Sequence, residues 1–282
     1  MLARVPASSA NLGPGFDCLA VALSLYLEVT LELSDDFKVT SEGCGAGQFD
    51  DERNLGARVA ADVLGHSNFS MHVKSDIPLT RGLGSSAALA VAAAVAAGET
   101  DPLAVGARVD GHAENAAASL LGGLVVAGSN ERGGVTARSL ALDPEWRFVI
   151  VVPDEELSTA EARRVLPDVV PFVDAVHNLS AMGLLLAGFA DHDDFVAGAM
   201  NDYLHQPYRM GLLSFAKPLL ETLRDSGAVG SCWSGAGSTM LGLATSERAE
   251  GVAIAARAFL HERGVAGVVH VLEADPTGLV TN

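Results

Sequence analysis

Alternating apolar and polar positions predict several strands in the first half of the chain. Val29–Leu33 carries a hydrophobic residue at every second position, which is typical of a half-buried strand, and a polar turn at residues 35–36 leads to a strand at Phe37–Thr40. This order predicts an antiparallel start to a sheet. The other strands predicted in this half are Leu2–Val5, Cys18–Leu25, Phe69–Lys74, Leu120–Ala127 and Val135–Leu142.

Helix signals separate these strands. Asn54 is a good N-cap for a helix that runs to Leu64. An Ala- and Val-rich run over residues 87–97 predicts a buried helix, because alanine is the best helix former. A further helix is expected to begin at Asp101-Pro102, with proline at its first position, and to run toward Ala118.

The second half predicts a different unit. We place a boundary at residues 144–146, which divides the chain into domains 1–146 and 147–282. Once its first helices are taken together, the second half has the order β-α-β-β-α-β, which is the split βαβ, ferredoxin-like arrangement with helices on one face of a sheet. The predicted strands are Phe148–Val152, Val229–Trp233, Thr239–Ala244 and Val268–Leu272, and the helices are Thr159–Leu166, Val173–Phe189, Leu212–Asp225 and Glu247–Arg263.

A glycine- and serine-containing loop precedes the Ala-rich helix. Gly82 and Gly84 allow a tight turn and a close approach of the backbone to a ligand, and Ser85-Ser86 supply hydroxyl groups. The free N–H groups at the helix N-terminus and the positive end of the helix dipole favour a phosphate there. The loop therefore predicts a phosphate site, and the alternative is a glycine turn that only starts a buried helix.

Two common phosphate motifs do not describe this loop. A P-loop needs Lys followed by Ser or Thr after its last glycine, and no lysine stands there. The dinucleotide pattern Gly-x-Gly-x-x-Gly/Ala is met by Gly82, Gly84 and Ala87, but it requires a buried strand before it and an acid-terminated strand after its helix. Residues 76–81 form a polar linker and residues 99–102 a turn, so both conditions fail.

A long segment near the start, Pro6–Asp17, is rich in glycine and other small residues and predicts a connecting loop. Asn11 and Asp17 lie among its glycines, and apolar strands hold both of its ends. Because functional polar groups are often carried on loops that a rigid scaffold positions, this segment is a candidate polar platform.

Composition narrows the class of protein. The 282 residues are 49% hydrophobic, with no apolar run flanked by charges that reaches the ~18 residues of a membrane span and no basic-then-apolar leader, which predicts a soluble cytoplasmic protein. The three cysteines are widely spaced and fit neither a disulfide framework nor a zinc site. A net charge of −17 argues against nucleic acid or an anionic membrane as a partner. An anionic substrate must therefore be met by local arginines, since lysine occurs only at positions 38, 74 and 217.

Three stretches together resemble the ordered motifs of the GHMP small-molecule kinases. They are residues 6–17, residues 78–88 and the glycine-rich segment 234–239. The resemblance spans nearly the whole chain and implies an α+β fold, with a ribosomal-S5-domain-2-like N-terminal domain and a ferredoxin-like C-terminal domain. Further matches at residues 159–167 and 205–209 resemble the branch of the family that phosphorylates homoserine.

The resemblance also implies the ligands and their residues. ATP is expected at the second motif, with Mg²⁺ beside Ser86 and Asp110, and a homodimer is compatible with the family. The nucleotide-binding residues would be Pro78, Arg81, Gly82, Leu83, Gly84, Ser85, Ser86 and Ala87.

For homoserine, the resemblance places Asn11 near the hydroxyl group and Asp17 on the ammonium group. Arg163 and Arg209 would bind the carboxylate, with Thr159 and His112 lining the pocket; Asn11, Ser86 and Asp110 form the expected catalytic set. These assignments agree with the chemistry, because arginine binds carboxylates in a bidentate manner and aspartate suits an amine. Phosphoryl transfer then needs mainly alignment and charge stabilisation.

Two positions depart from the resemblance. The homoserine branch usually carries Glu in the helix just before a His-x-Asp-Asn stretch, where it helps to hold Mg²⁺; the positions here are Arg108 and Asp110, and the Asp of that stretch is Glu114. Two alternatives therefore stay open beside a kinase for homoserine: a GHMP kinase for another small alcohol, for which paired arginines are not needed, and a non-catalytic binding homologue.

Overall fold

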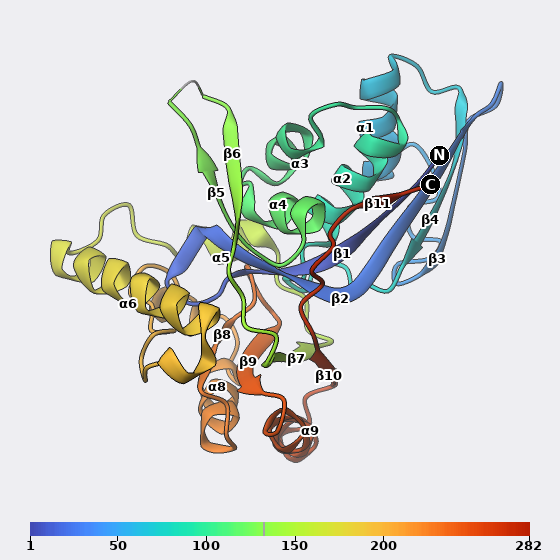
Figure 1. Ribbon diagram of the computed structural model, residues 1–282. Helices are drawn as coiled ribbons and strands as arrows, with labels where there is room; N and C mark the ends of the chain where they lie inside the picture. The colour runs from blue at the N-terminus through green and yellow to red at the C-terminus, as the bar shows by residue number, and fades with distance from the viewer. Residues whose placement is uncertain (132) are drawn as a thin grey trace.

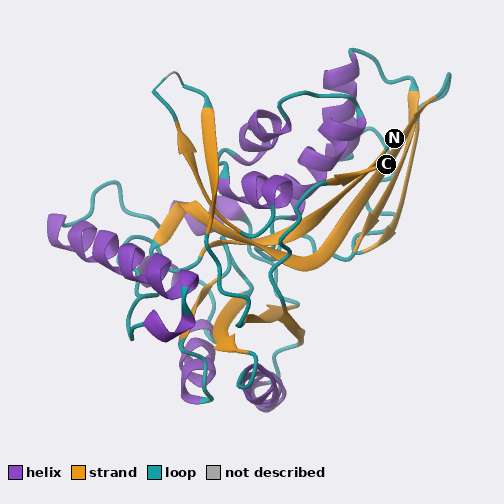
Figure 2. Cartoon of the chain, viewed as in Figure 1, coloured by secondary structure: helices purple, strands orange, loops and turns teal. Residues whose placement is uncertain are grey.

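The computed structural model describes residues 1–131 and 133–282, which form two β-sheets with helices packed on them (Figures 1 and 2). The first sheet has the order β11-β1-β2-β4-β3, with β5 paired to β2 and β6 paired to β5. Its strands are β1 (Leu2–Asn11), β2 (Gly15–Leu33), β3 (Lys38–Gly43), β4 (Phe69–Ser75), β5 (Leu124–Ser129), β6 (Val135–Leu140) and β11 (Val280–Thr281).

The hairpin of β1 and β2 is longer than the sequence suggests. Most of the segment 6–17 expected as a loop is strand: β1 continues to Asn11 and β2 begins at Gly15, so the loop prediction is wrong for residues 6–11 and 15–17. The small side chains there are buried because helices pack directly on the strand: Ser8 Oγ donates to Asn115 Oδ1 at 2.8 Å, and Ser119 Oγ donates to the Pro6 carbonyl at 3.1 Å. The small side chains of this strand allow the helices to pack closely on it.

β3 pairs with β4 and runs parallel to it, so the expected antiparallel start at Phe37–Thr40 is wrong. Helix α1 (Leu55–Leu64) connects β3 to β4, and a strand, helix, strand crossover produces a parallel pair. β4 then lies between β3 and β2 and pairs with β2 in the antiparallel sense. The N-cap prediction is confirmed, since Asn54 Oδ1 accepts from the Ala57 N–H at 3.2 Å.

Helices α1, α2 (Ser85–Ala96), α3 (Pro102–Asp110) and α4 (Glu114–Leu121) lie on one side of the first sheet (Figure 1). The single helix predicted from Asp101 toward Ala118 is two helices. Gly111 ends α3 in the left-handed region at φ +80°, and its N–H donates to the Ala107 carbonyl. The chain turns at this break before α4, and Asp110, His112, Glu114 and Asn115 beside it line the candidate site described below.

The second sheet has the order β10-β7-β9-β8 and is antiparallel throughout, which confirms the ferredoxin-like prediction. Its strands are β7 (Trp146–Pro153), β8 (Gly230–Trp233), β9 (Met240–Thr245) and β10 (Gly267–Leu272). Helices α8 (Ala216–Asp225) and α9 (Ala249–Arg263) pack on it. The connections carry α5 (Thr159–Arg164), α6 (Phe172–Ala190), a 3₁₀ turn at His192–Asp194 and the short α7 (Gln206–Arg209).

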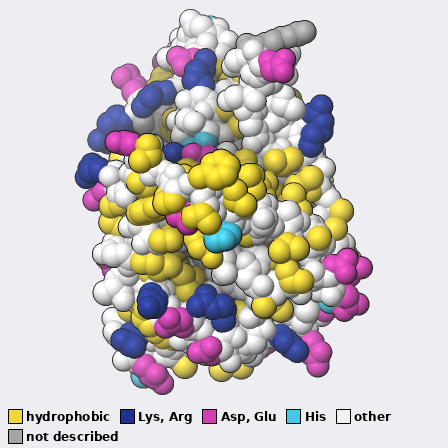
Figure 3. Space-filling model, turned by 90° about the vertical axis from the view of Figure 1, so that its left-hand side faces the viewer, with side chains coloured by type: hydrophobic (Ala, Val, Ile, Leu, Met, Phe, Trp, Pro, Cys, Tyr) yellow, Lys and Arg dark blue, Asp and Glu magenta, His cyan; other side chains and the backbone are white. Residues whose placement is uncertain are grey.

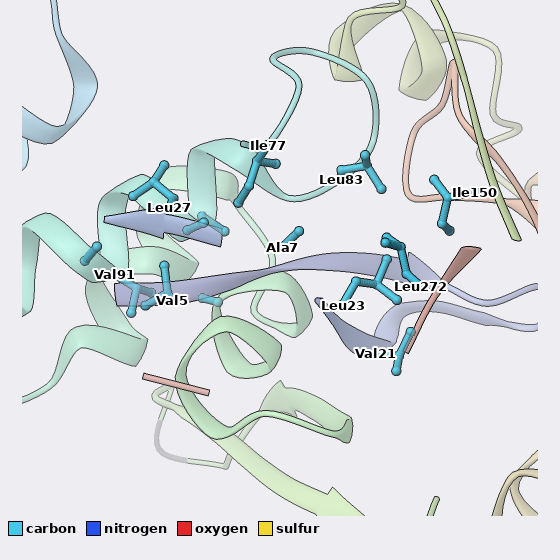
Figure 4. Packing of buried hydrophobic residues seen from close by; sticks show 14 of the residues in the cluster. Val5, Ala7, Val21, Leu23, Leu27, Ile77, Leu83, Val91, Ile150 and Leu272 are labelled. Carbon is cyan, nitrogen blue, oxygen red and sulfur yellow. The ribbon is translucent and has the colours of Figure 1, made fainter. Parts of the chain in front are cut away.

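One hydrophobic core joins the two halves. Figure 4 shows Leu23 of β2 and Leu83 of the glycine loop together with Ile150 of β7 and Leu272 of β10. β11 also pairs with β1 after the second sheet is complete, with Ala3 opposite Thr281. The expected division into 1–146 and 147–282 stays a prediction, and the shared core holds the two sheets together at the site.

Among the described residues, α6 is the one helix whose length and mean hydropathy of 1.4 meet those of a membrane span. Sequence alone did not suggest this, because Asp174 and Asn178 interrupt its apolar residues. Asn178 is buried against the β1/β2 turn, where its Nδ2 donates to the Pro14 carbonyl at 2.7 Å. One face of α6 is therefore packed on the protein itself.

Candidate active site

A cavity of about 430 Å³ lies where the three sequence motifs meet. The β1/β2 turn, the glycine loop, the start of α5 and residues 235–237 all contribute to its wall. The predicted site residues that line it are Asn11, Asp17, Arg81, Gly82, Gly84, Ser85, Ser86, Asp110, His112, Thr159, Arg163 and Arg209. Three predicted nucleotide-binding residues do not line it: Leu83 and Ala87 are in the hydrophobic core, and Pro78 lies outside the wall.

The glycine loop is shaped by contacts with the protein as well as by its exposure to the cavity. Gly82 and Gly84 have φ of +73° and +68°, a region that favours glycine. A Cβ at Gly82 would lie 2.2 Å from the Ser234 carbonyl oxygen, and a Cβ at Gly84 would lie 2.1 Å from Ser8 Oγ. Gly84 is the N-cap of α2, so the free N–H groups of that helix face the cavity side.

Arg81 anchors this loop to the end of β7. Its Nε donates to the Pro153 carbonyl at 2.9 Å and its Nη2 to the Asp154 carbonyl at 2.6 Å, while Nη1 lies 3.2 Å from Glu156 Oε1. Each guanidinium nitrogen thus has a protein partner. The structure assigns Arg81 a positioning contact, and its predicted contact with a nucleotide stays a prediction.

Ser86 and Asp110 form a pair at the N-terminus of α2. Ser86 Oγ donates to Asp110 Oδ1 at 2.5 Å. Burial raises the pKa of Asp110, and the Ser86 hydrogen bond and the nearby His112 oppose this rise only in part. A hydroxyl and a carboxylate are the hard oxygen donors that Mg²⁺ prefers, so the two residues fit the ion expected beside the phosphates.

Asn11 fixes the turn between β1 and β2. The residue is in the left-handed region at φ +72°; its Oδ1 accepts from the Asp17 N–H at 3.0 Å, and its Nδ2 donates to the Gly235 carbonyl at 2.8 Å. The side-chain amide therefore connects the first motif to the third. This contact was not predicted, and it holds Asp17 at the cavity wall.

Asp17 and Arg163 were expected to bind opposite ends of the amino-acid substrate, and in the structure they bind each other. Arg163 Nη2 donates to Asp17 Oδ1 at 2.6 Å and Nη1 donates to Asp17 Oδ2 at 3.0 Å, in a bidentate pair whose two side chains are about one-third exposed. Arg163 lies on α5, which begins with a capping box at Ser158 and Glu161. Thr159 follows the cap and faces the same cavity.

Arg209 is held in place by His205, a residue that had no predicted role of its own. The Arg209 side chain is buried; Nε donates to the Ala162 carbonyl at 3.1 Å, and Nη1 donates to the Gly235 carbonyl and to His205 Nδ1, both at 3.0 Å. Nη2 makes no hydrogen bond with the described residues. It is therefore the donor left for a ligand in the cavity.

His205 is neutral, with one defined tautomer. Burial lowers the pKa of His205 to about 4, with Asp202 opposing and Arg209 adding to this shift. Because Arg209 can only donate, Nδ1 must accept, so Nε2 carries the hydrogen and donates to the Gly13 carbonyl at 2.9 Å. Its spacing of four residues before Arg209, across the start of α7, is the signal that could have identified it.

The ring of Phe16 contacts both Arg163 and Arg209. It stacks on His205 at a centroid distance of 5.0 Å, and the guanidinium carbons of Arg163 and Arg209 lie 5.5 and 5.4 Å from the ring centre. Arginine over an aromatic face is a favourable arrangement. Phe16 lies in the first sequence motif, residues 6–17, and had no predicted role.

The cavity wall also carries a cluster of acidic residues around His112. Glu114 is 1% exposed, its Oε1 lies 2.7 Å from His112 Nδ1, and its Oε2 has no hydrogen-bond partner among the described residues. Burial lowers the pKa of His112, but the Glu114 contact and the charges of Asp110 and Asp17 outweigh burial, so the pKa is raised. Asp17, His112 and Glu114 place their ligand atoms within 4.8 Å of one another, a set that attracts a cation.

The His112–Glu114 pair makes the stability of the fold depend on pH. A histidine whose pKa is raised on folding stabilises the protein below its unfolded pKa of 6.5, and this contribution is lost as the pH rises through the folded value. We expect Glu114→Gln to reduce the free energy of unfolding by about 1.5–3 kcal/mol at pH 5.5, the range for a hydrogen bond to a charged group, and by less at pH 8.5. Urea unfolding at the two pH values measures this. His261→Gln, at an exposed position of α9, is the control, and an equal loss at both pH values would contradict the assignment.

The fold and the cavity are those of a small-molecule phosphotransferase, and the chain belongs to the GHMP kinase family. Residues 54–123 match the family model described as GHMP kinases N terminal domain, and residues 173–262 match GHMP kinases C terminal. Within the family the chain is similar to homoserine kinases. The homoserine kinase of Desulfitobacterium hafniense is 38% identical over 290 residues, which cover 98% of this chain and 97% of that protein.

Other relatives and solved structures show the same similarity. The homoserine kinase of Mycolicibacterium smegmatis is 38% identical over 264 residues, covering 85% of this chain and 83% of that protein. The crystal structure of homoserine kinase from Cytophaga hutchinsonii has a TM-score of 0.86 at 25% identity and covers 99% of this chain and 96% of its own. L. major mevalonate kinase in complex with R-mevalonate has a TM-score of 0.73 at 16% identity over 97% of this chain and 95% of that one, which shows a shared fold.

Proposed function

We propose that this chain transfers the γ-phosphoryl group of ATP to the side-chain hydroxyl of L-homoserine, giving O-phospho-L-homoserine for threonine biosynthesis. One observation carries the proposal: a charge pair suited to a zwitterion, Asp17 with Arg163, lies in the same cavity as the helix N-terminus suited to phosphate. The homoserine kinases among its relatives support the same reaction. The net charge of −17 gives no support to nucleic acid or an anionic membrane as a partner, and we place the reaction in the cytoplasm.

The substrate is recognised by exchange of the existing ion pair. An α-amino acid carries an ammonium and a carboxylate group, so it can replace Arg163 on Asp17 and Asp17 on Arg163 at the same time. Arg209 Nη2 supplies a second donor to the carboxylate, and buried Glu114 adds negative charge on the ammonium side. A neutral alcohol would have to break the Asp17–Arg163 pair without replacing either partner, which favours homoserine over such substrates.

The protein contributes alignment and charge stabilisation to the transfer. The N–H groups at the start of α2 bind the phosphates, and Ser86 and Asp110 would hold Mg²⁺, which neutralises phosphate charge when bound. Asn11, fixed by its two hydrogen bonds, orients the hydroxyl of homoserine toward the phosphates. No strong base is required, because catalysis of phosphoryl transfer rests on positioning and electrostatics.

A substrate panel tests the proposal. We expect ADP release in the presence of ATP and Mg²⁺ to rise with L-homoserine and to stay at the background rate with mevalonate or galactose. Release with mevalonate or galactose alone would assign the chain to another small alcohol. ATP binding by calorimetry with no ADP release for any alcohol would instead identify a non-catalytic binding homologue.

The shortened carboxylate at position 110 gives a second test. We expect Asp110→Glu to lower the Mg²⁺ concentration for half-maximal activity, since the longer side chain reaches the ion more directly, and Asp110→Asn to raise it roughly tenfold, equivalent to about 1.4 kcal/mol of metal binding. Asparagine keeps an oxygen that can accept from Ser86 Oγ, so this variant isolates the charge. Magnesium titrations of both variants that superimpose on the wild-type curve would exclude Asp110 from the metal side of the site.

A further inference from the structure

One carboxylate in the cavity wall is buried with an oxygen left over. Charged side chains of this protein mostly lie at the surface, as the acidic and basic groups in Figure 3 do, where water solvates them. Glu114 is different: it is 1% exposed, and its Oε2 has no hydrogen-bond partner within residues 1–131 and 133–282. A buried carboxylate is costly unless a donor or a cation compensates it, so Glu114 indicates that a positively charged group binds beside it.

Three elements bring ligand atoms together around this carboxylate. Glu114 is the first residue of α4, His112 lies in the break between α3 and α4, and Asp17 lies near the start of β2. His112 Nδ1 is 2.7 Å from Glu114 Oε1, and one ligand atom from each of the three residues lies within 4.8 Å of the others. All three residues line the cavity, so an ion can reach them from it.

The donor set favours a transition metal over the ion that accompanies ATP. Mg²⁺ takes oxygen ligands, whereas an imidazole nitrogen with two carboxylates suits Zn²⁺ and its neighbours in the first transition series. The ligands of a four-coordinate zinc ion lie about 2.0–2.2 Å from the metal and hence about 3.3–3.6 Å from one another, a spacing that small movements of these side chains reach. Three protein ligands leave the fourth position open to the cavity.

The surroundings of Glu114 hold it in place without using its second oxygen. Asn115 Nδ2 donates to Glu114 Oε1 at 3.4 Å, and Asn115 Oδ1 accepts from the buried Ser8 Oγ at 2.8 Å. Outer partners of this kind orient the carboxylates that bind metals. Because Oε2 is free, Glu114 can bind an ion and keep its contact with Asn115.

A second group of possible ligands lacks this feature. Asp143, Asp191 and His192 also place ligand atoms within 4.8 Å of one another, but Asp191 is exposed. Asp143 accepts hydrogen bonds from the N–H groups of Glu145 and His192, and Asp191 accepts one from the Asp193 N–H. Backbone donors and solvent therefore satisfy these carboxylates, and the group serves as a comparison for the buried one.

An ion bound by the buried group would occupy the place of the substrate's ammonium group. Under the proposed function, that ammonium lies between Asp17 and Glu114, and it replaces Arg163 on Asp17. A divalent ion replaces Arg163 in the same way and carries twice the charge. We propose that Asp17, His112 and Glu114 form an inhibitory site for Zn²⁺, in which the ion excludes the amino acid. The inhibition rests on the proposed function, whereas the metal site rests on the three side chains alone.

Calorimetric titration of zinc sulfate into the full chain tests the site. A large excess of Mg²⁺ occupies the Ser86–Asp110 pair, and neither ATP nor an alcohol is present, so activity plays no part. We expect one tightly bound zinc ion per chain. His112→Gln should weaken it by roughly 100-fold or more, since even the loss of an outer partner costs about 10–100-fold. His192→Gln, the matched variant in the second group, should bind zinc as the wild type does.

Cobalt gives a spectroscopic readout of the same site. Four-coordinate Co²⁺ absorbs visible light much more strongly than the hydrated ion, so cobalt bound by the wild type and by His192→Gln should be coloured. His112→Gln should leave the spectrum of hydrated Co²⁺. The wild-type spectrum needs no variant, and a spectrum of the hydrated ion for cobalt bound to the wild type would overturn the proposed coordination.

Initial-rate kinetics separates the metal site from the proposed function. Zn²⁺ should raise the KM for homoserine and leave kcat and the KM for ATP unchanged. Absence of tight zinc binding, unchanged binding by His112→Gln, or loss of binding in His192→Gln would overturn the site. A zinc affinity that falls in proportion to the Mg²⁺ concentration would place the ion on Ser86 and Asp110 and also overturn it. If zinc binds through His112 but the chain does not phosphorylate homoserine, the metal site stands and the proposed function fails.

Discussion

Replacing Arg163 by alanine is expected to raise the KM for homoserine about ten- to a hundred-fold and to leave the KM for ATP unchanged. A hydrogen bond to a charged group contributes about 1.5–3 kcal/mol, and about 1.4 kcal/mol is a factor of ten. The side chain is more than one-third exposed and its partner Asp17 remains hydrated without it, so folding should not suffer. Initial-rate kinetics with each substrate varied in turn measures the effect.

The chain offers a neighbouring control for this variant. Arg164 follows Arg163 in the last turn of α5 and does not line the cavity, so Arg164→Ala should keep the wild-type KM for homoserine. A substrate analogue without the carboxylate, 3-aminopropan-1-ol, should react poorly with both the wild type and Arg163→Ala and to a similar extent. An unchanged KM for homoserine in Arg163→Ala would move the amino-acid site elsewhere.

Replacing Arg209 by methionine should affect both binding and folding. Methionine has a similar length but cannot donate, so the Ala162 carbonyl and His205 Nδ1 lose their buried donor, while the Gly235 carbonyl keeps the hydrogen bond from Asn11 Nδ2. Each buried group left without a partner costs about 1–3 kcal/mol, and we expect the free energy of unfolding to fall by about 3 kcal/mol or more. Homoserine binding should become undetectable, because Nη2 is lost and the adjoining loops loosen.

Urea unfolding and homoserine calorimetry measure the two effects. Arg209→Lys keeps the positive charge but cannot span three acceptors with one ammonium group, so it should rescue little of the stability. Arg147→Met is the control, because Arg147 also donates to backbone carbonyls and lies outside the cavity. If Arg209→Met were as stable as the wild type, the buried hydrogen-bond network would not support the fold as described.

Local signals predicted most of the elements. The N-cap at Asn54, the glycine loop before α2 and the succession of strands and helices in the second half each follow from residues close together in sequence. The family resemblance then brought the distant motifs to one site, which periodicity alone could not do.

The wrong or missing predictions concern segments whose structure depends on contacts between residues far apart in the chain. Residues 6–11 have loop-like composition, but α2 and α4 pack on them and require small side chains in a strand. The contacts of His205 with Gly13 and Phe16 join segments almost 200 residues apart, so only the four-residue spacing of His205 and Arg209 could be found in the local sequence. The Asp17–Arg163 pair could likewise be found only in three dimensions.

The pairing of β11 with β1 bears on how the chain folds during synthesis. Val280 lies opposite Arg4, and the Asn282 N–H donates to the Leu2 carbonyl at 3.2 Å, so the outer strand of the first sheet is supplied by residues made after the whole second sheet. Until those residues leave the ribosome, one edge of β1 has no neighbour. Unpaired strand edges on nascent chains attract other strands, so we expect this edge to be the place where incomplete chains associate and chaperones bind.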